Sequence, residues 1–518
     1  MPETVEDIEA AIEEATTPGF REQLLARGEA RSMIWRDGVL PEDAPAFDQL
    51  LSYDLLSYGY SLLGLGLRLV EANGSQSLAQ RAFEGAATAI ESVIARGPNS
   101  RERGFHRVVA AAAYHLGSYS ARAYSLLQTS LDSGEVTIGE RSLIHIIRRE
   151  LDTLDALILS HRDEDVAADA NLVETLRGLF EPTSDEDQDA DSGDTDVIDV
   201  VDLALTDAFV GAISMALLAF ERGEQALLDE ALSTLQVGLG AASELNMVPH
   251  WWCHRLAIHL LRGLWEASFH RLLPDGPIDG DGGDLARLRA TFIASLFRRR
   301  RSEIDLWPSQ LAAAERVLNT SENLVLSLPT SAGKTRIAEL CILACLAEGR
   351  RVVFGTPLRA LSAQTETALQ RTFTPLGKTV TSLYGAIGAS SADEDLLRER
   401  DIVVATPEKL DFALRNAPTL LDDVGLVVLD EGHMIGADER EVRYEVQVQR
   451  LLRREDAATR RIICLSAILP DGDEVEDFVN WLTDDQPDGL IASSWRPTKL
   501  RYGEVIWQGD RARLSIIV

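Results

Sequence analysis

Cysteine is scarce in this 518-residue sequence, and its scarcity excludes two kinds of protein. The four cysteines, Cys253, Cys341, Cys345 and Cys464, are too few for a disulfide framework and lack the spacing of a zinc site. Cys341 and Cys345 are four positions apart, about one helical turn, in an apolar stretch. We therefore expect the cysteines to be small apolar residues of buried cores.

Long hydrophobic runs are also missing. No run of 18 uncharged apolar residues occurs, and the first residues, MPETVEDIEAAIEEATT, are acidic where a secretory signal is basic and then apolar. We expect a cytoplasmic protein with no membrane partner. The hydrophobic content of 45% is sufficient for buried cores, and the length suits about three domains.

Positive charge is carried almost entirely by arginine. Only four of the 50 basic residues are lysine, and the 83 acidic residues give a net charge of −33. Such an acidic, lysine-poor composition resembles that of proteins from salt-loving microbes, so we expect a halophilic protein. The composition lacks the basic stripe of a typical nucleic-acid binder. It does not exclude such binding, because counterion release contributes little affinity in concentrated salt.

The first 303 residues have a helical pattern. Apolar residues recur at spacings of three and four through residues 1–180 and 203–273, which predicts helical hairpins. Small residues and turn glycines resemble tetratricopeptide-type repeats, but no strict 34-residue period occurs, so simple hairpins and true repeats are both open. Residues 181–202 are acidic and of low complexity, which predicts a disordered loop. Residues 274–303 are expected to be a linker ending in a basic helix end.

The pattern changes at residue 304. Short apolar runs alternate with helical patterns as far as residue 510; the runs are NLVLSL, RVVFGTP, DIVVATP, GLVVLDE and RIICLSA. This alternation predicts a parallel, doubly wound sheet, in which ligands bind at the carboxyl ends of the strands. The expected fold class is therefore an all-helical N-terminal region followed by one α/β domain.

The run NLVLSL leads into a candidate phosphate-binding loop. Its residues are small or apolar: Pro329, Thr330, Ser331, Ala332 and Gly333. A helix is expected from Lys334, whose charge would meet the phosphates of ATP, and the hydroxyl of Thr335 would meet Mg²⁺. Leu328 replaces the first glycine of the usual motif, so this stretch alone is weak support.

Two acids strengthen the hypothesis. Asp430 and Glu431 follow the apolar run GLVVL, and a Mg·ATP site requires an acid near the phosphate loop. We expect Asp430 to coordinate Mg²⁺ and Glu431 to polarise the attacking water. The cofactors predicted from these residues are ATP and Mg²⁺.

Five segments then match a known family in order and spacing. LPTSAGKT, TPLRALSAQ (356–364), VVATPEKLD (403–411), LDEGHMIG (429–436) and LSAILP (465–470) resemble motifs I, Ia, Ib, II and III of superfamily 2 DExH-box helicases. DLWPSQ (305–310) resembles the Q motif of these enzymes. SSWRPTKLRYGEV (493–505) is similar to a segment of the branch of exosome-associated and archaeal repair helicases. The resemblance covers residues 304–510 and implies a RecA-like, ATP-binding motor domain.

The resemblance implies roles for individual residues. Gln310 would contact adenine, and residues 329–335 would hold the phosphates. The implied catalytic residues are Lys334, Asp430, Glu431 and His433. Ser466 and Ala467 would couple the nucleotide state to the nucleic acid, although Ile468 stands where threonine is usual. Arg359, Thr406 and Pro407 would contact the phosphate backbone of single-stranded DNA or RNA.

Helicases of this family use two RecA-like domains, and the second supplies arginine fingers. No Q-x-x-G-R-x-G-R motif occurs in this sequence. We therefore expect an ATP-dependent helicase or ATPase that requires a partner polypeptide, with residues 511–518 as the start of the missing second domain. The alternative is an ATP-binding interaction protein with a helical partner surface and a vestigial motor domain.

Overall fold

The computed structural model describes most of the chain. The described residues are 4–34, 42, 47–48, 50–94, 101–128, 136–162, 190–273, 283–330, 332–383, 398–432, 434–435, 438–467, 473–497, 502–508 and 511–517. They form two compact units. The helical unit comprises Met1–Leu264, Arg300–Ser302 and Pro497–Val518. The second unit, called the motor unit only for the family that its sequence resembles, comprises Trp265–Arg299 and Glu303–Arg496. Each unit is described by itself.

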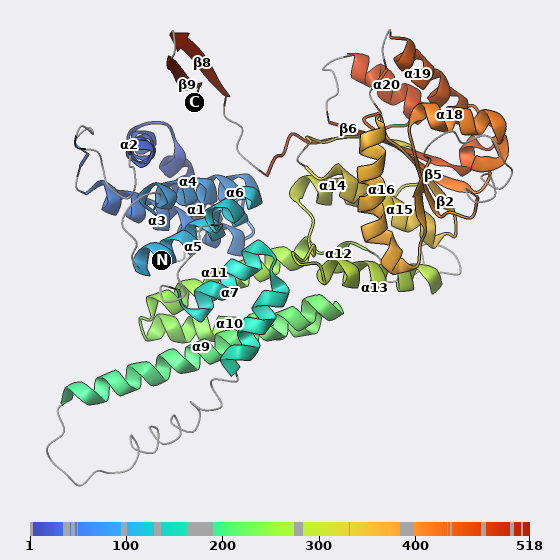
Figure 1. The fold of residues 1–518 in the computed structure, drawn as a ribbon. Coiled ribbons are helices and arrows are strands. Elements are labelled where there is room, and N and C mark those ends of the chain that lie inside the picture. Colours follow the sequence, from blue (N-terminus) through green and yellow to red (C-terminus); the bar gives the residue numbers. More distant parts are fainter. Residues whose placement is uncertain are drawn as a thin grey trace. The chain divides into compact units, whose positions relative to one another are not determined.

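The helical unit is built from antiparallel helices (Figure 1). The bounds are α1 (Val5–Thr16), α2 (Phe20–Ile34), α3 (Leu51–Glu71), α4 (Gln76–Ile94), α5 (Arg101–Leu116), α6 (Ser120–Leu126), α7 (Ile138–Arg148), α9 (Ala190–Arg222), α10 (Gln225–Glu244) and α11 (Val248–Glu266). Residues 151–162 are also helical. This architecture confirms the predicted all-helical N-terminal region.

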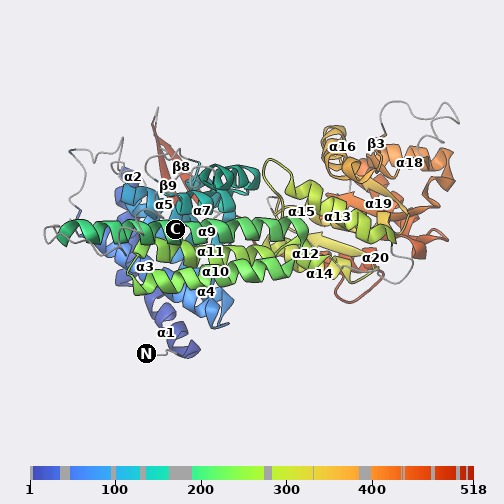
Figure 2. The same ribbon diagram turned by 90° about the horizontal axis from the view of Figure 1, so that it is seen from below.

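Small residues let neighbouring helices approach closely. A Cβ atom at Gly59 of α3 would lie 2.7 Å from a side-chain carbon of Ile90 in α4, and one at Gly66 would lie 2.7 Å from the ring of Phe83. The small residues seen in the sequence therefore set the spacing of this hairpin. Helices α9 and α10 form a second, longer hairpin and run side by side in Figure 2.

Helix α9 differs from the sequence-based expectation. It begins at Ala190, so residues 190–202, expected to belong to an acidic disordered loop, are helical. The acidic residues extend a helix whose later turns are stabilised by packing, since Leu205, Phe209 and Ile213 are buried. Adding residues to an existing helix is far easier than starting one. The remainder of the expected loop, residues 181–189, lies outside the described residues.

The segment Val200–Arg222 of α9 is long and apolar enough, by length and composition, to span a membrane. Its mean hydropathy is 1.9, and half of the 18-residue window with this hydropathy is buried inside the protein. A core helix has the same composition, and Phe209, Ile213 and Phe220 are buried. Packing within the helical unit thus accounts for the buried half of this window.

The motor unit contains a seven-stranded parallel sheet in the order β3-β4-β2-β5-β6-β1-β7. The strands are β1 (Leu324–Ser327), β2 (Arg351–Gly355), β3 (Val380–Ser382), β4 (Ile402–Ala405), β5 (Val424–Asp430), β6 (Arg461–Ser466) and β7 (Leu490–Ala492). β2, β4 and β5 are almost entirely buried, as expected of central strands covered on both faces. The predicted doubly wound α/β fold is confirmed.

Helices cover both faces of this sheet (Figure 1). One face packs against α13 (Gly283–Phe297), α14 (Pro308–Leu318), α15 (Lys334–Ala347) and α16 (Arg359–Phe373). The other packs against α18 (Pro407–Asn416), α19 (Glu439–Leu452) and α20 (Asp473–Thr483). Short helices α12 (Phe269–Leu272), η1 (Thr374–Leu376), η2 (Pro418–Leu421) and η3 (Ala457–Thr459) complete the unit.

The cysteines are core residues, as predicted: Cys253 is buried in the helical unit, and the other three are buried in the motor unit.

The start of the motor unit differs from the expected residue 304. Helix α13, expected to be part of a linker, buries Leu288, Phe292 and Leu296 in the same core as the sheet. Its apolar face therefore makes it part of the α/β fold.

The last described residues form a β-hairpin, and whether they begin a second domain stays a prediction. Residues 511–517, expected to begin a second motor domain, form β9 (Arg511–Ile517), which pairs antiparallel with β8 (Tyr502–Gln508). Only Gly509 and Asp510 separate the two strands in sequence, a length and composition typical of a hairpin. These strands therefore pair with each other locally.

Candidate nucleotide-binding site and strand-end segments

The loop between β1 and α15 forms a cradle for an anion. The amide of Ala332 donates to the carbonyl of Pro329 at 2.9 Å, which turns the loop back on itself. Gly333 precedes the helix with φ of 75°, a left-handed conformation that favours glycine. The amides of a helix N-terminus that begins at Lys334 favour a phosphate. Ser331 lies outside the described residues.

Gln310 closes one side of this loop from the first turn of α14. Its Nε2 donates to the carbonyl of Gly333 at 3.0 Å, and its Oε1 accepts from the amide of Trp307 at 2.9 Å. A Cβ atom at position 333 would lie 2.1 Å from Nε2 of Gln310. Gln310 therefore supports the phosphate loop directly, while its predicted contact with adenine stays a prediction.

The carboxylate of the residue directly after β5 contacts Lys334, the first residue after the phosphate loop. Oε1 of Glu431 lies 3.2 Å from Nζ of Lys334, which is only 7% exposed. In the sheet, β6 separates β5 from β1, so the two acids lie one strand away from the phosphate loop. Burial and the charge of Glu431 raise the pKa of Asp430, and the charge of Lys334 opposes the rise.

The backbone after β5 is constrained. Glu431 has φ of 51°, which is uncommon for a residue with a side chain. The amide of Gly432 donates to the carbonyl of Leu465 at 3.1 Å, and a Cβ atom at Gly432 would lie 2.5 Å from Sγ of Cys464. Strained backbone of this kind is common where function fixes a side chain. His433 lies outside the described residues.

The residues present suit Mg²⁺. Thr335 is exposed beside the loop, and Asp430 offers a carboxylate, so both supply the oxygen donors that Mg²⁺ prefers. Across the described ranges, no cluster of three or more His, Cys, Asp or Glu side chains could hold a metal alone. Mg²⁺ commonly keeps several waters and binds through one or two carboxylates together with substrate phosphates.

The end of β6 lies between the loop and the acids. The carbonyl of Ser466 accepts from the amide of Leu328 at 3.0 Å, and the preceding carbonyl of Leu465 holds Gly432. Ser466 is fully buried, and Ala467 follows it. This position fits the predicted coupling role, which stays a prediction. Ile468 lies outside the described residues.

The segments expected to bind nucleic acid lie together at the ends of β2 and β4. These strands are neighbours, and the amide of Thr356 donates to the carbonyl of Ala405 at 2.9 Å. Arg359 is the exposed first residue of α16, and Pro407 is the first residue of α18, directly after Thr406. Two helix N-termini therefore begin at one edge of the sheet, where amides can bind phosphates.

Arg440 connects these segments and was not identified from the sequence. Its Nε lies 2.6 Å from Oε1 of Glu408, and its guanidinium also donates to the carbonyl of Pro357. The contact partners are 32 and 83 residues away in sequence. No local pattern could have revealed these contacts.

Together these features define a class of protein. A phosphate loop after β1 and two acids after β5, on a doubly wound parallel sheet, form a RecA-like nucleotide-binding domain. Residues 307–478 match the sequence model of the DEAD/DEAH box helicase family. This region of the chain is a DEAD/DEAH box helicase domain.

Several curated helicases are similar to the chain. Hachiman protein HamB of Bacillus cereus is 27% identical over 352 residues, which is 66% of this chain and 30% of that protein. ATP-dependent DNA helicase Hel308 of Pyrococcus abyssi is 35% identical over 218 residues, which is 42% of this chain and 28% of that protein. The chain thus spans less than a third of the length of either relative.

The solved structure of the DUF1998 helicase MrfA bound to DNA is also similar, at 23% identity and a TM-score of 0.34, covering 39% of this chain and 29% of that chain. The match to HamB is longer than the 254 residues from Trp265 to Val518, so that similarity extends into the helical unit.

Proposed function

We propose that this chain is the ATP-binding part of a DExH-type motor whose ATP hydrolysis depends on single-stranded nucleic acid. The observation that supports this most directly is the contact of Lys334 with Glu431 beside the phosphate loop. Lys334 belongs to the motif with which helicases bind the phosphates, and Glu431 belongs to the motif with which they orient the attacking water. The family membership of residues 307–478 agrees with this proposal.

The ion pair suggests how binding would prepare hydrolysis. Lys334 is buried and paired with Glu431 at 3.2 Å. The phosphates of ATP would compete for Lys334, and Glu431 would then be released to orient the attacking water. Thr335 and Asp430 would hold Mg²⁺, which neutralises charge that develops on the phosphates.

Full activity, in this proposal, requires a second RecA-like domain, on a partner polypeptide or elsewhere in the same protein. The parallel sheet in the described part of the chain forms one such domain. Arginine fingers supplied to a P-loop site are worth roughly 10³ to 10⁵ in rate. The chain by itself should therefore bind ATP but hydrolyse it slowly.

The test is ATP binding and steady-state hydrolysis in about 1 M KCl, with and without single-stranded DNA or RNA. Lys334→Ala should weaken ATP binding at least about tenfold, because it removes the buried charge that meets the phosphates. Lys378→Ala is a matched control, since Lys378 pairs with Asp401 away from the loop.

Three outcomes are informative. Binding by the original chain that Lys334→Ala abolishes supports the proposal. Duplex unwinding by this chain alone contradicts the need for a second domain. Binding that Lys334→Ala leaves unchanged favours the alternative of an ATP-binding interaction protein with a vestigial motor domain, and no binding at all contradicts both.

A further inference from the structure

An acidic residue lies where the proposed function requires a phosphate. Glu408 is the second residue of α18, in the first turn of a helix whose N-terminus is one of the two expected to bind the nucleic-acid backbone. The amides of such a turn attract any anion, so the carboxylate of Glu408 and a phosphate of the strand compete for the same helix end. A carboxylate without a positive partner would also repel the strand.

Arg440 of α19 pairs with this carboxylate. Its Nε lies 2.6 Å from Oε1 of Glu408, on a different helix and 32 residues away in sequence. Burial raises the pKa of Glu408, but hydrogen bonds from Arg440, from its own amide and from the hydroxyl of Thr406 lower it, so the pKa lies below its usual range. Glu408 is therefore ionised at neutral pH, and Arg440 neutralises its charge.

Arg440 also contacts the neighbouring strand end. Its guanidinium donates to the carbonyl of Pro357, and the next residue, Leu358, directly precedes α16. One side chain therefore contacts both segments at which a strand is expected to bind. Arginine can make both contacts at once because its N–H donors form a rigid fork.

This ion pair lies at the surface of the motor unit. The side chains of Arg440 and Glu408 are 48% and 50% exposed. Exposed pairs contribute little to folding stability, so stability alone is a weak explanation for a pair that joins two helices and a strand end. The exposure also means that either side chain can be changed without opening a core.

We propose that Arg440 is a positioning residue for nucleic-acid binding, which neutralises Glu408 and thereby keeps the N-terminus of α18 available to a phosphate of the single strand. Its contact with Pro357 holds the start of α16 beside the start of α18. Arg440 acts through these two partners, without a phosphate contact of its own. This inference rests on the proposed function and adds a residue outside the segments that resemble motifs Ia and Ib.

The test is a double-mutant cycle on the full chain, measured by fluorescence anisotropy with labelled oligo-dT and oligo-rU in about 0.2 M KCl. Arg440→Gln keeps a hydrogen-bond donor for Pro357 but loses the charge opposite Glu408. We expect it to raise the dissociation constant roughly three- to tenfold, because one unpaired negative charge then faces the strand. In about 1 M KCl this effect should shrink, since salt screens the repulsion.

The second substitution of the cycle removes the carboxylate. Glu408→Gln alone should bind the strand at least as tightly as the original chain, because it leaves Arg440 without an acidic partner beside the strand. Arg440→Gln combined with Glu408→Gln should return to within about twofold of the original dissociation constant, because no unpaired carboxylate remains. This rescue separates neutralisation of Glu408 from a purely structural role of Arg440.

Glu266 and Arg271 supply the matched control. Nε of Arg271 lies 3.0 Å from Oε2 of Glu266, and the two side chains are 62% and 59% exposed. They line a cavity with Gly425, near the start of β5, so they lie at the opposite edge of the sheet from the strand ends. Arg271→Gln and Glu266→Gln should each change the dissociation constant by less than about twofold. Circular dichroism should show that every variant is folded.

Three results would overturn the inference. Unchanged strand binding in Arg440→Gln would show that Glu408 needs no neutralisation. A double variant as weak as Arg440→Gln would mean that Arg440 contacts a phosphate itself. An equal loss in Arg271→Gln would mean that overall charge, and not this pair, sets the affinity. Failure of the original chain to bind either oligonucleotide would instead refute the proposed function, and this inference with it.

Discussion

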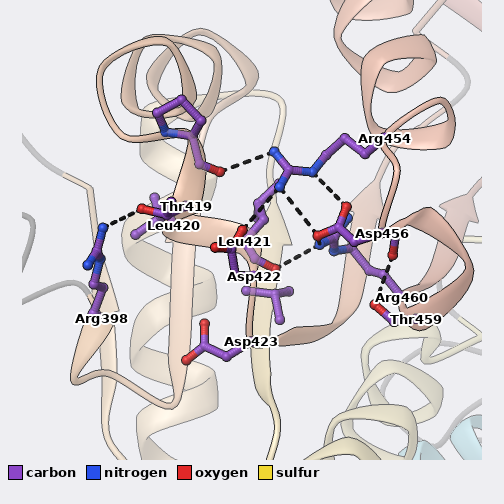
Figure 3. A network of polar contacts seen from close by, with 12 residues as sticks. Arg398, Thr419, Leu420, Leu421, Asp422, Asp423, Arg454, Asp456, Thr459 and Arg460 are labelled. Atoms are coloured by element: carbon purple, nitrogen blue, oxygen red, sulfur yellow. Dashed lines mark hydrogen bonds and ion pairs between the residues drawn. The ribbon is translucent and has the colours of Figure 1, made fainter.

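Asp456 is a carboxylate held by two arginines in the motor unit. Its Oδ1 accepts from Nε of Arg454 at 2.9 Å, and its Oδ2 accepts from Nη2 of Arg460 at 2.8 Å (Figure 3). Arg454 also donates to the carbonyl of Pro418, and Arg460 donates to the carbonyl of Leu421. The network therefore joins the segment before β6 to the segment before β5. Arginine can make several such contacts at once because its five N–H donors form a rigid fork.

This geometry predicts a pH dependence of stability. The hydrogen bond from Arg454, then that from Arg460, holds the pKa of Asp456 well below its usual range. A carboxyl whose pKa is lowered by folding stabilises the protein above its unfolded pKa of about 3.9, and this contribution is lost as the pH falls toward the folded pKa. Asp456→Asn should therefore lower the free energy of unfolding at pH 7 by about 1 kcal/mol, a value reduced by partial exposure.

The measurement is urea unfolding of both proteins between pH 7 and pH 3. The difference between them should shrink below about pH 4, where the carboxyl becomes protonated in the unfolded state while folding still keeps it ionised. Asp422→Asn is the control, since Asp422 is 59% exposed and contacts only the rim of the network, Arg454 at 3.2 Å. A pH-independent difference would show that the charge of Asp456 is not what stabilises the network.

At the scale of elements, the two glycines at the ends of α15 allow a matched comparison. Gly333 and Gly349 have φ of 75° and 72°, so an alanine is strained at both. A Cβ atom at Gly333 would meet Gln310 at 2.1 Å, whereas one at Gly349 meets nothing within 4 Å. The two substitutions thus share backbone strain and differ in what they do to the phosphate loop.

We expect Gly333→Ala to lower stability by about 1–2 kcal/mol and to weaken ATP binding at least about tenfold, because it displaces Gln310 from the loop. Gly349→Ala should cost about 1 kcal/mol and leave ATP binding unchanged. Calorimetric titration with Mg·ATP and urea unfolding measure the two effects. Equal loss of ATP binding in both variants would show that general destabilisation, and not the loop contact, is responsible.

Much of the motor unit was predictable from local sequence. The runs ending at Ser327 and Asp430 form β1 and β5, because continuous apolar residues suit buried central strands. The loop at Gly333 followed from the anion chemistry of small residues before a helix. The contacts of Arg440 could not be predicted, since they join residues from separate elements and carry no periodic signal. The helical start of α9 was missed because acidic, low-complexity sequence resembles a disordered segment.

At the scale of the whole molecule, the net charge predicts that stability depends on salt. A charge of −33 on 518 residues implies self-repulsion in the folded state that salt screens. We expect the midpoint of thermal unfolding to rise by about 5 °C or more between 0.1 and 2 M KCl. Choline chloride at equal ionic strength separates screening from a specific effect of K⁺. A midpoint that is constant or falls with salt would contradict the halophilic interpretation.

The near-absence of lysine has a practical consequence for chemical labelling. Only four side chains carry an amine, and Lys334 is buried and paired with Glu431 beside the phosphate loop. An amine-directed reagent therefore has only four lysine side chains to modify, and the reactivity of one of them, Lys334, should depend on bound nucleotide. Covalent modification followed by mass spectrometry would read the occupancy of the ATP site almost directly, in a protein whose other positive charge is almost all arginine.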